Sequence, residues 1–275
     1  MKKLLHPKNL PISVTIMGMV GFVLNLWTLS GGVDDEQLYT FVKFPWILLG
    51  ILTVAVPVFI VLLTRPLGEP LKYSMNFPAS VVSGVGTALG ALVIVFGGVD
   101  SFATSPDVLG LITGVLGILG GILLFAVAYA RWKGVRANFL YHGIVCLFLA
   151  LRTFNHCKNW SNQPQFYPFL FTFLFQICAT LAVYQLCAFD VELGDRRKSL
   201  FWSLMTVYLC LVALPSTQDV LFCGGVAIWM LTNLCSLRPV RKRRPAPVKD
   251  EENVEVPLIG TDVTMEEIKS WVDEE

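Results

Sequence analysis

The sequence lacks the short motifs that mark well-known catalytic sites. It contains no His-Glu-x-x-His pair, no Gly-x-Ser-x-Gly turn and no Gly-x-x-x-x-Gly-Lys loop. Its three histidines, His6, His142 and His156, lie far apart along the chain, so a metal site would need ligands from several helices. We expect no catalytic residue, no bound metal and no cofactor, and an enzyme is the class of protein that the sequence supports least.

Charged side chains are scarce as well. They make up 15% of the 275 residues, whereas apolar residues make up 55%. An ordinary soluble domain carries about 25% charged residues, so this composition excludes that class. The net charge of +1 gives no reason to expect a nucleic-acid partner. The charges are unevenly distributed along the chain, because ten of the 20 acidic residues lie between Asp250 and Glu275.

Cysteine is absent before Cys146, and none of the seven cysteines forms a Cys-x-x-Cys pair. Six of them fall within apolar runs, where a free cysteine behaves as a small apolar residue. Only Cys157 lies outside these runs. A disulfide framework is therefore not expected.

Long apolar runs, by contrast, recur along most of the chain. About 20 apolar residues suffice for a helix to cross the hydrocarbon core of a membrane. The predicted spans are residues 11–30, 45–64, 78–96, 108–130, 138–153, 167–189, 200–214 and 220–237. The first run is too long for a signal peptide and has no small-x-small cleavage site after it, so we expect it to be retained. We predict an all-α, polytopic integral membrane bundle of about eight transmembrane helices.

Most lysines and arginines lie in alternate segments between the predicted spans. The remaining segments contain only three basic residues, Lys43, Arg152 and Lys158. Because cytoplasmic loops are enriched in Lys and Arg, both termini are predicted to be cytoplasmic. We expect a multi-pass protein of a cell membrane, and the lysine-rich start favours the bacterial cytoplasmic membrane.

Residues 238–275 differ in character and are predicted to form a cytoplasmic tail. A basic cluster, Arg241–Arg244, is followed by a proline-containing, acidic linker. The capping-box pattern Thr264–Glu267 then predicts a short amphipathic helix. Three apolar side chains would share one face of this helix: Ile268, Trp271 and Val272. A segment this short is not expected to fold alone, so we expect it to dock on a protein partner or on the basic loops.

Small residues recur at helical spacing in two neighbouring spans. They are Gly86 and Gly90 in the third span, and Gly110, Gly114, Gly117 and Gly121 in the fourth. Small residues let helix backbones approach closely in lipid. The favoured interpretation is that the third and fourth spans pack on each other, and the alternative is formation of a homo-oligomer.

Polar residues within spans are costly and are therefore candidates for function. Thr172, Gln176 and Thr180 form a polar line on one face of the sixth span, and Asn25 lies in the first. Such side chains often form hydrogen bonds between helices, which is the simpler interpretation. The functional one is a solute site in the outer half of the bundle, lined by Arg152, Gln176, Asn25 and Asp219.

An ion pair is predicted between Arg152 and Asp219. Only fifteen residues separate Arg136 from Arg152, and they rise about 22 Å as a helix, less than the ~30 Å hydrocarbon core. Arg152 must therefore reach toward the headgroups, thin the bilayer or face the bundle interior. A desolvated guanidinium needs an acceptor, and Asp219 is the acidic residue of the next outward turn in this half of the chain.

The sequence therefore predicts a non-catalytic membrane protein of a scaffolding or assembly kind, with the lipid bilayer and a protein partner as its contacts. The alternative is a small-solute transporter. A transporter would need a water-accessible cavity that reaches Gln176, whereas a scaffold would have a tightly packed bundle.

Overall fold

The computed structural model describes residues 9–31, 42–65, 73–104, 107–161 and 167–237. Nine helices form in these ranges, eight of them between 17 and 26 residues long. They are α1 (Asn9–Leu29), α2 (Lys43–Thr64), the single turn α3 (Tyr73–Asn76), α4 (Val81–Thr104), α5 (Val108–Lys133), α6 (Phe139–Trp160), α7 (Tyr167–Asp190), α8 (Arg196–Ala213) and α9 (Val220–Ser236). The predicted all-helical class is confirmed.

Five of these helices are long and apolar enough to cross a membrane: α1, α2, α4, α5 and α7. This agrees with the prediction of an integral membrane protein. The helices α6 and α9 begin directly after polar residues, Asn138 and Asp219. The side chain of Asn138 accepts a hydrogen bond from Leu140 N at the start of α6, as an N-cap residue does.

The helices α4 and α6 extend furthest beyond their predicted spans. The helix α4 runs eight residues past Phe96 to Thr104, and α6 runs seven residues past Thr153 to Trp160. Arg152 therefore lies inside a helix rather than at its end. The extension of α4 carries Asp100, which the sequence placed in a loop, onto a helical face.

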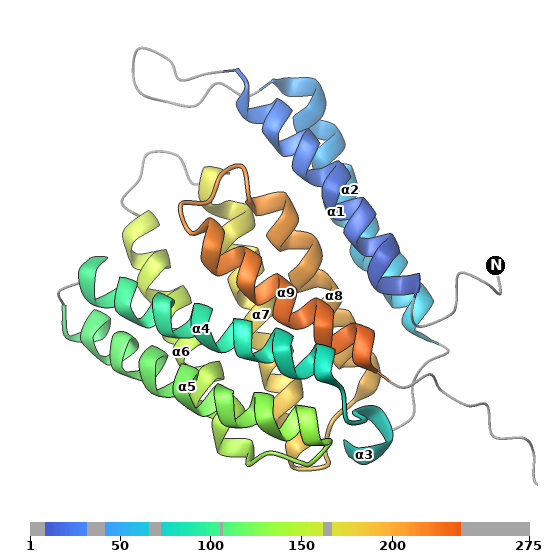
Figure 1. The fold of residues 1–275 in the computed structure, drawn as a ribbon. Coiled ribbons are helices and arrows are strands. Elements are labelled where there is room, and N and C mark those ends of the chain that lie inside the picture. Colours follow the sequence, from blue (N-terminus) through green and yellow to red (C-terminus); the bar gives the residue numbers. More distant parts are fainter. Residues whose placement is uncertain (1–8, 32–41, 66–72, 105–106, 162–166, 238–275) are drawn as a thin grey trace, which may run out of the picture. The chain divides into compact units, whose positions relative to one another are not determined.

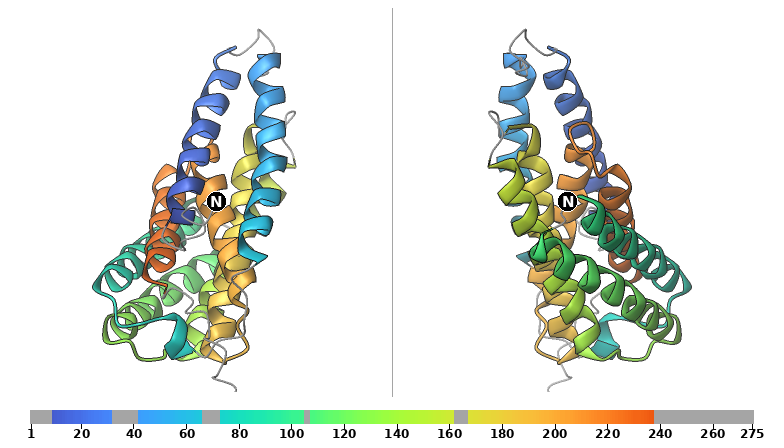
Figure 2. Two further views of the ribbon diagram at one scale, coloured as in Figure 1. Left: turned by 90° about the vertical axis from the view of Figure 1, so that its right-hand side faces the viewer. Right: turned by 90° about the vertical axis from the view of Figure 1, so that its left-hand side faces the viewer.

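The helices α4 to α9 pack in chain order as a closed ring, because each contacts the next and α9 returns to α4 (Figure 1). The hairpin of α1 and α2 packs side by side and lies against α8 (Figure 2). Its packing is fixed in part by Asn25 of α1, whose amide nitrogen donates to Val212 O of α8 at 2.7 Å.

The closest helix pair is α4 with α5, which run antiparallel. Small residues meet at intervals of seven along it: Gly84 faces Ala128, Ala91 faces Gly121, and Gly98 faces Gly114 and Gly117. A Cβ atom built on Gly98 would lie only 2.8 Å from Ile118 N. Backbone approach of this kind requires glycine.

The two predicted glycine stripes face different neighbours. Gly114, Gly117 and Gly121 do contact α4, so the predicted packing of the third span on the fourth is confirmed for them. The prediction is wrong for Gly86 and Gly90, which face Thr232 and Trp229 of α9. Gly110 is buried in α5. Helical spacing identified the small faces but could not say which helix covers each one.

Candidate functional site

Arg152 is the centre of a buried polar cluster at one end of the ring. Its Nη1 donates to Gly97 O at 2.8 Å and to Ser101 Oγ at 3.2 Å. Its Nη2 donates to Asp219 Oδ2 at 2.8 Å and to Asp100 Oδ2 at 3.1 Å. We call these five residues the Arg152 cluster. They join α4 and α6 to the N-terminal end of α9.

The cluster buries the cation and leaves its two carboxylate partners closer to solvent or headgroups. The side chain of Arg152 is 2% exposed, whereas those of Asp219 and Asp100 are 24% and 41% exposed. The ring of Phe222 covers the guanidinium, with its centroid 4.5 Å from Cζ. Charge-assisted hydrogen bonds to two carboxylates and an aromatic face offset the cost of desolvating the charge.

A histidine and an amide extend this cluster toward α7. Gln176 Nε2 lies 3.0 Å from His156 Nδ1, and His156 Nε2 lies 3.9 Å from Asp219 Oδ2. If the amide nitrogen donates, Nδ1 accepts, so a neutral ring carries its proton on Nε2, facing Asp219. The ring of Trp160 packs edge-on against His156.

Three of the four residues predicted to line a solute site thus lie together. The predicted ion pair between Arg152 and Asp219 is confirmed, and Gln176 reaches Asp219 through His156. Asn25 instead donates a hydrogen bond to Val212 O of α8. Asp100 was not predicted to belong to the site, because the predicted span stopped at Phe96. No role was predicted for His156.

Some buried polar atoms near this cluster have no hydrogen-bond partner among the described residues. They are Arg152 Nε, Gln176 Oε1 and Thr172 Oγ1. The hydroxyl of Thr180 bonds to Gln176 O within α7. Within the described ranges, His, Cys, Asp and Glu form no group of three or more suited to hold a metal ion.

A second set of buried charges lies at the other end of α4, where no polar cluster was predicted. The guanidinium of Arg131 lies over the rings of Phe77 and Tyr73, with centroids 3.8 and 5.1 Å from Cζ. Nearby, His142 Nδ1 lies 2.5 Å from Asp190 Oδ2, and both side chains are almost completely buried. We call these five residues the Arg131 cluster.

Within the Arg131 cluster, the guanidinium itself is held by ring contacts. Arg131 Nη1 and Nη2 have no hydrogen-bond partner in the described part of the chain. Burial raises the pKa of the Tyr73 hydroxyl; Arg131 opposes this shift and Asp190 adds to it. Asn76, in the same turn as Tyr73, accepts at its Oδ1 a hydrogen bond from Arg196 Nη1 at 3.1 Å.

The predicted tail, residues 238–275, lies outside the described residues, and so does its apolar face of Ile268, Trp271 and Val272. No family model, curated protein or solved structure matches this chain. The two clusters and the packing around them are therefore the basis for a functional proposal.

Proposed function

We propose that this chain is a non-catalytic integral membrane protein that scaffolds or assembles other proteins. One observation carries the proposal: Arg152, the most conspicuous intramembrane charge, is bound by four acceptors from its own chain. Arg152 Nε has no hydrogen-bond partner among the described residues, but a guanidinium that serves a solute site would turn its two terminal nitrogens, Nη1 and Nη2, toward the solute. These donors instead tie three helices together, which is what a rigid framework requires.

The proposed topology has eight spans, with both termini in the cytoplasm of a bacterial cell. The ring supports the count, because α6, α8 and α9 lie between or beside α4, α5 and α7. If the latter three cross the membrane, the shorter helices packed against them cross it too. A reporter fused after Glu275 should therefore read cytoplasmic, and one inserted between α4 and α5 should read external. The same reading from both would reject the even span count.

The acidic tail is the proposed contact for a protein partner. Purification of the full chain and of a chain that ends after Leu237 tests this. We expect a co-purifying partner to be retained by the full chain and lost from the shortened one. A full-length variant with Ile268, Trp271 and Val272 changed to Ser should lose the partner as well. Equal retention by all three proteins would contradict tail docking.

A small-solute transporter is the second candidate, and one observation favours it. The unpartnered oxygens Gln176 Oε1 and Thr172 Oγ1 are both buried on α7. Atoms of this kind are costly unless water or a ligand reaches them. Thr172 and Gln176 lie one turn apart on one face of the helix, and Gln176 Nε2 lies 3.0 Å from His156 Nδ1.

Thiol accessibility at Gln176 separates the two candidates. The variant Gln176→Cys is made in a chain whose seven native cysteines are replaced by Ala, after its thermal unfolding has been checked. A scaffold should leave this thiol unmodified by a membrane-impermeant maleimide until the protein is denatured. Ser161→Cys, at the exposed end of α6, is the matched control and should react in the folded state. Rapid labelling at position 176 would favour a transporter.

A further inference from the structure

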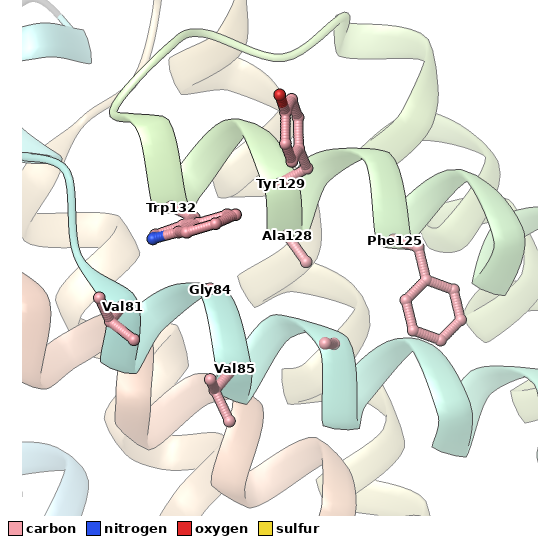
Figure 3. A pocket seen from close by; sticks show the side chains of 8 residues that line it. Val81, Gly84, Val85, Phe125, Ala128, Tyr129 and Trp132 are labelled. Carbon is pink, nitrogen blue, oxygen red and sulfur yellow. The ribbon is translucent and has the colours of Figure 1, made fainter.

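A groove of about 410 Å³ lies between the start of α4 and the end of α5 (Figure 3). Small residues line it where the helices approach each other: Gly84 and Ala88 of α4 and Ala128 of α5. Trp132 and Phe125 project from α5 toward α4 on either side of Ala128 (Figure 3). The groove is long, open along one side and almost entirely apolar.

The surface around this groove suits hydrocarbon rather than water. Its rims are exposed, with Val81 at 63%, Val85 at 56% and Trp132 at 56%. Both helices are long and apolar enough to cross a membrane, so lipid chains are the solvent that this surface meets. A flexible acyl chain can follow a shallow groove between two helices and recover the contacts that the small residues leave open.

One end of the groove also has the features of a headgroup site. Tyr129 and Trp132 meet edge to face there, and aromatic residues of this kind gather at the membrane–water interface. Lys133 follows at once, is exposed, and holds its Nζ 4.6 Å from the centroid of the Tyr129 ring. Among the described residues no carboxylate pairs with Lys133, whereas the nearby Arg136 pairs with Glu192.

We propose that this groove binds an anionic phospholipid, with one acyl chain along Gly84, Ala88 and Ala128 and the phosphate beside Lys133. The positive charge selects the headgroup, and the small residues admit the chain. The inference rests on α4 and α5 crossing a membrane, and it is independent of the scaffolding role.

Native mass spectrometry of the purified full chain tests the proposal. Palmitoyl-oleoyl phosphatidylglycerol and phosphatidylcholine are added separately, and the bound fraction of each is measured. We expect phosphatidylglycerol to bind about fivefold more tightly, the preference that one basic residue confers near a membrane surface. Ala88→Phe should fill the groove and abolish lipid binding. Lys133→Gln should reduce phosphatidylglycerol binding to the level of phosphatidylcholine.

Two matched controls separate the groove from general effects. A second apolar groove of about 270 Å³, beside Val115 on α5, lacks aromatic and basic residues, so Val115→Phe should leave lipid binding unchanged. Lys43→Gln removes an exposed lysine from the start of α2 and should also have no effect. Lys133→Gln changes a surface charge alone, so it tests the proposal even if Ala88→Phe fails to fold.

The proposal is overturned if Ala88→Phe folds and retains as much lipid as the unchanged chain, or if Lys133→Gln keeps the fivefold preference. A dimer that Ala88→Phe converts to a monomer would overturn it too, because a second copy of the chain would then be the occupant.

Discussion

Two buried guanidinium groups, at opposite ends of α4, are held in different ways. Arg152 donates to four acceptors on α4 and α9. Arg131 has no hydrogen-bond partner for Nη1 or Nη2 in the described part of the chain and lies over two aromatic rings instead. Both side chains are 2% exposed. Two guanidinium groups with the same exposed fraction are therefore stabilised by hydrogen bonds at one end of α4 and by ring faces at the other.

The difference bears on what each end of the bundle does. Hydrogen bonds are directional, so the Arg152 cluster requires one register of α4, α6 and α9. A ring face accepts a cation over a range of positions, so Arg131 itself constrains register less. Polar groups that fix a unique arrangement are a recognised use of buried charge. We infer that the Arg152 cluster specifies how the ring closes and that Arg131 mainly fills space at its own end, where His142 and Asp190 form the directional contact.

The largest expected effect comes from removing both carboxylates that bind Arg152. Asp100→Ala with Asp219→Ala would leave a buried cation without a counter-charge, which should cost about 4 kcal/mol of unfolding free energy. Each single change should cost about 2 kcal/mol or less, because the other carboxylate remains. Denaturant titration in detergent micelles, followed by helical circular dichroism, measures these values.

Arg152→Met is the control for this experiment. Added to the double variant, it removes the stranded charge and should recover part of the lost stability. The cluster would not matter for stability if the two single changes were harmless and the double change showed no rescue by Arg152→Met.

The next largest effect tests whether the seam between α4 and α5 is tighter at the Arg152 end. At Gly98 a new Cβ would meet three backbone atoms of α5 at 2.8 to 2.9 Å, whereas at Gly84 the nearest atoms are 3.2 Å away. Gly98→Ala should force the helices apart and displace the neighbouring Gly97 carbonyl, at a cost of about 3 kcal/mol. Gly84→Ala should cost about 1 kcal/mol in the same titration.

Gly50→Ala on α2 is the matched control, because nothing lies within 4 Å of its new Cβ. It should be neutral or slightly stabilising, since alanine favours a helix by about 1 kcal/mol over glycine. Equal losses at Gly98 and Gly84 would mean that the seam does not distinguish the two ends.

A smaller effect is expected where Arg131 meets the rings. Phe77→Leu removes the ring face but keeps an apolar side chain, and it should cost about 2 kcal/mol. In an Arg131→Met background the same change should cost clearly less, because no cation is left to lose the ring. A double-mutant cycle gives this coupling directly. Additive losses would show that Phe77 acts by packing alone.

The sequence predicted the parts of this fold that depend on local composition. Apolar runs of about 20 residues identified the helices, because lipid demands that each span satisfy its own backbone. The pairing of Arg152 with Asp219 followed from a short run between two arginines and from the scarcity of acidic residues nearby. These inferences need only length, charge and hydropathy.

The missed residues all depend on how helices face one another. Asp100 was assigned to a loop because hydropathy falls after Phe96, yet α4 continues there and Asp100 meets Arg152. His142 and Asp190 lie 48 residues apart and meet only because α6 and α7 pack in one register. Asn25 was placed at the site, but α1 turns its amide toward α8. Helical periodicity shows which residues share a face and does not name the partner of that face.

The smallest expected effect concerns an exposed pair near the Arg152 end, which shows what a similar contact contributes without burial. Lys158 Nζ lies 2.8 Å from Asp107 Oδ2, with side chains 54% and 61% exposed. The hydrogen bond and charge of Lys158 hold the pKa of Asp107 below its ordinary value of 3.8. Because the folded pKa is the lower one, the pair stabilises the fold above that ordinary value and loses its effect as the pH falls through the depressed pKa.

Asp107→Asn should therefore cause only a small loss of stability at neutral pH, and the loss should vanish in strong acid. Unfolding midpoints of both proteins across this pH range measure it, with Lys158→Gln as the partner control. A loss at neutral pH as large as that of Asp219→Ala would show that burial is not what distinguishes the Arg152 cluster from this surface pair.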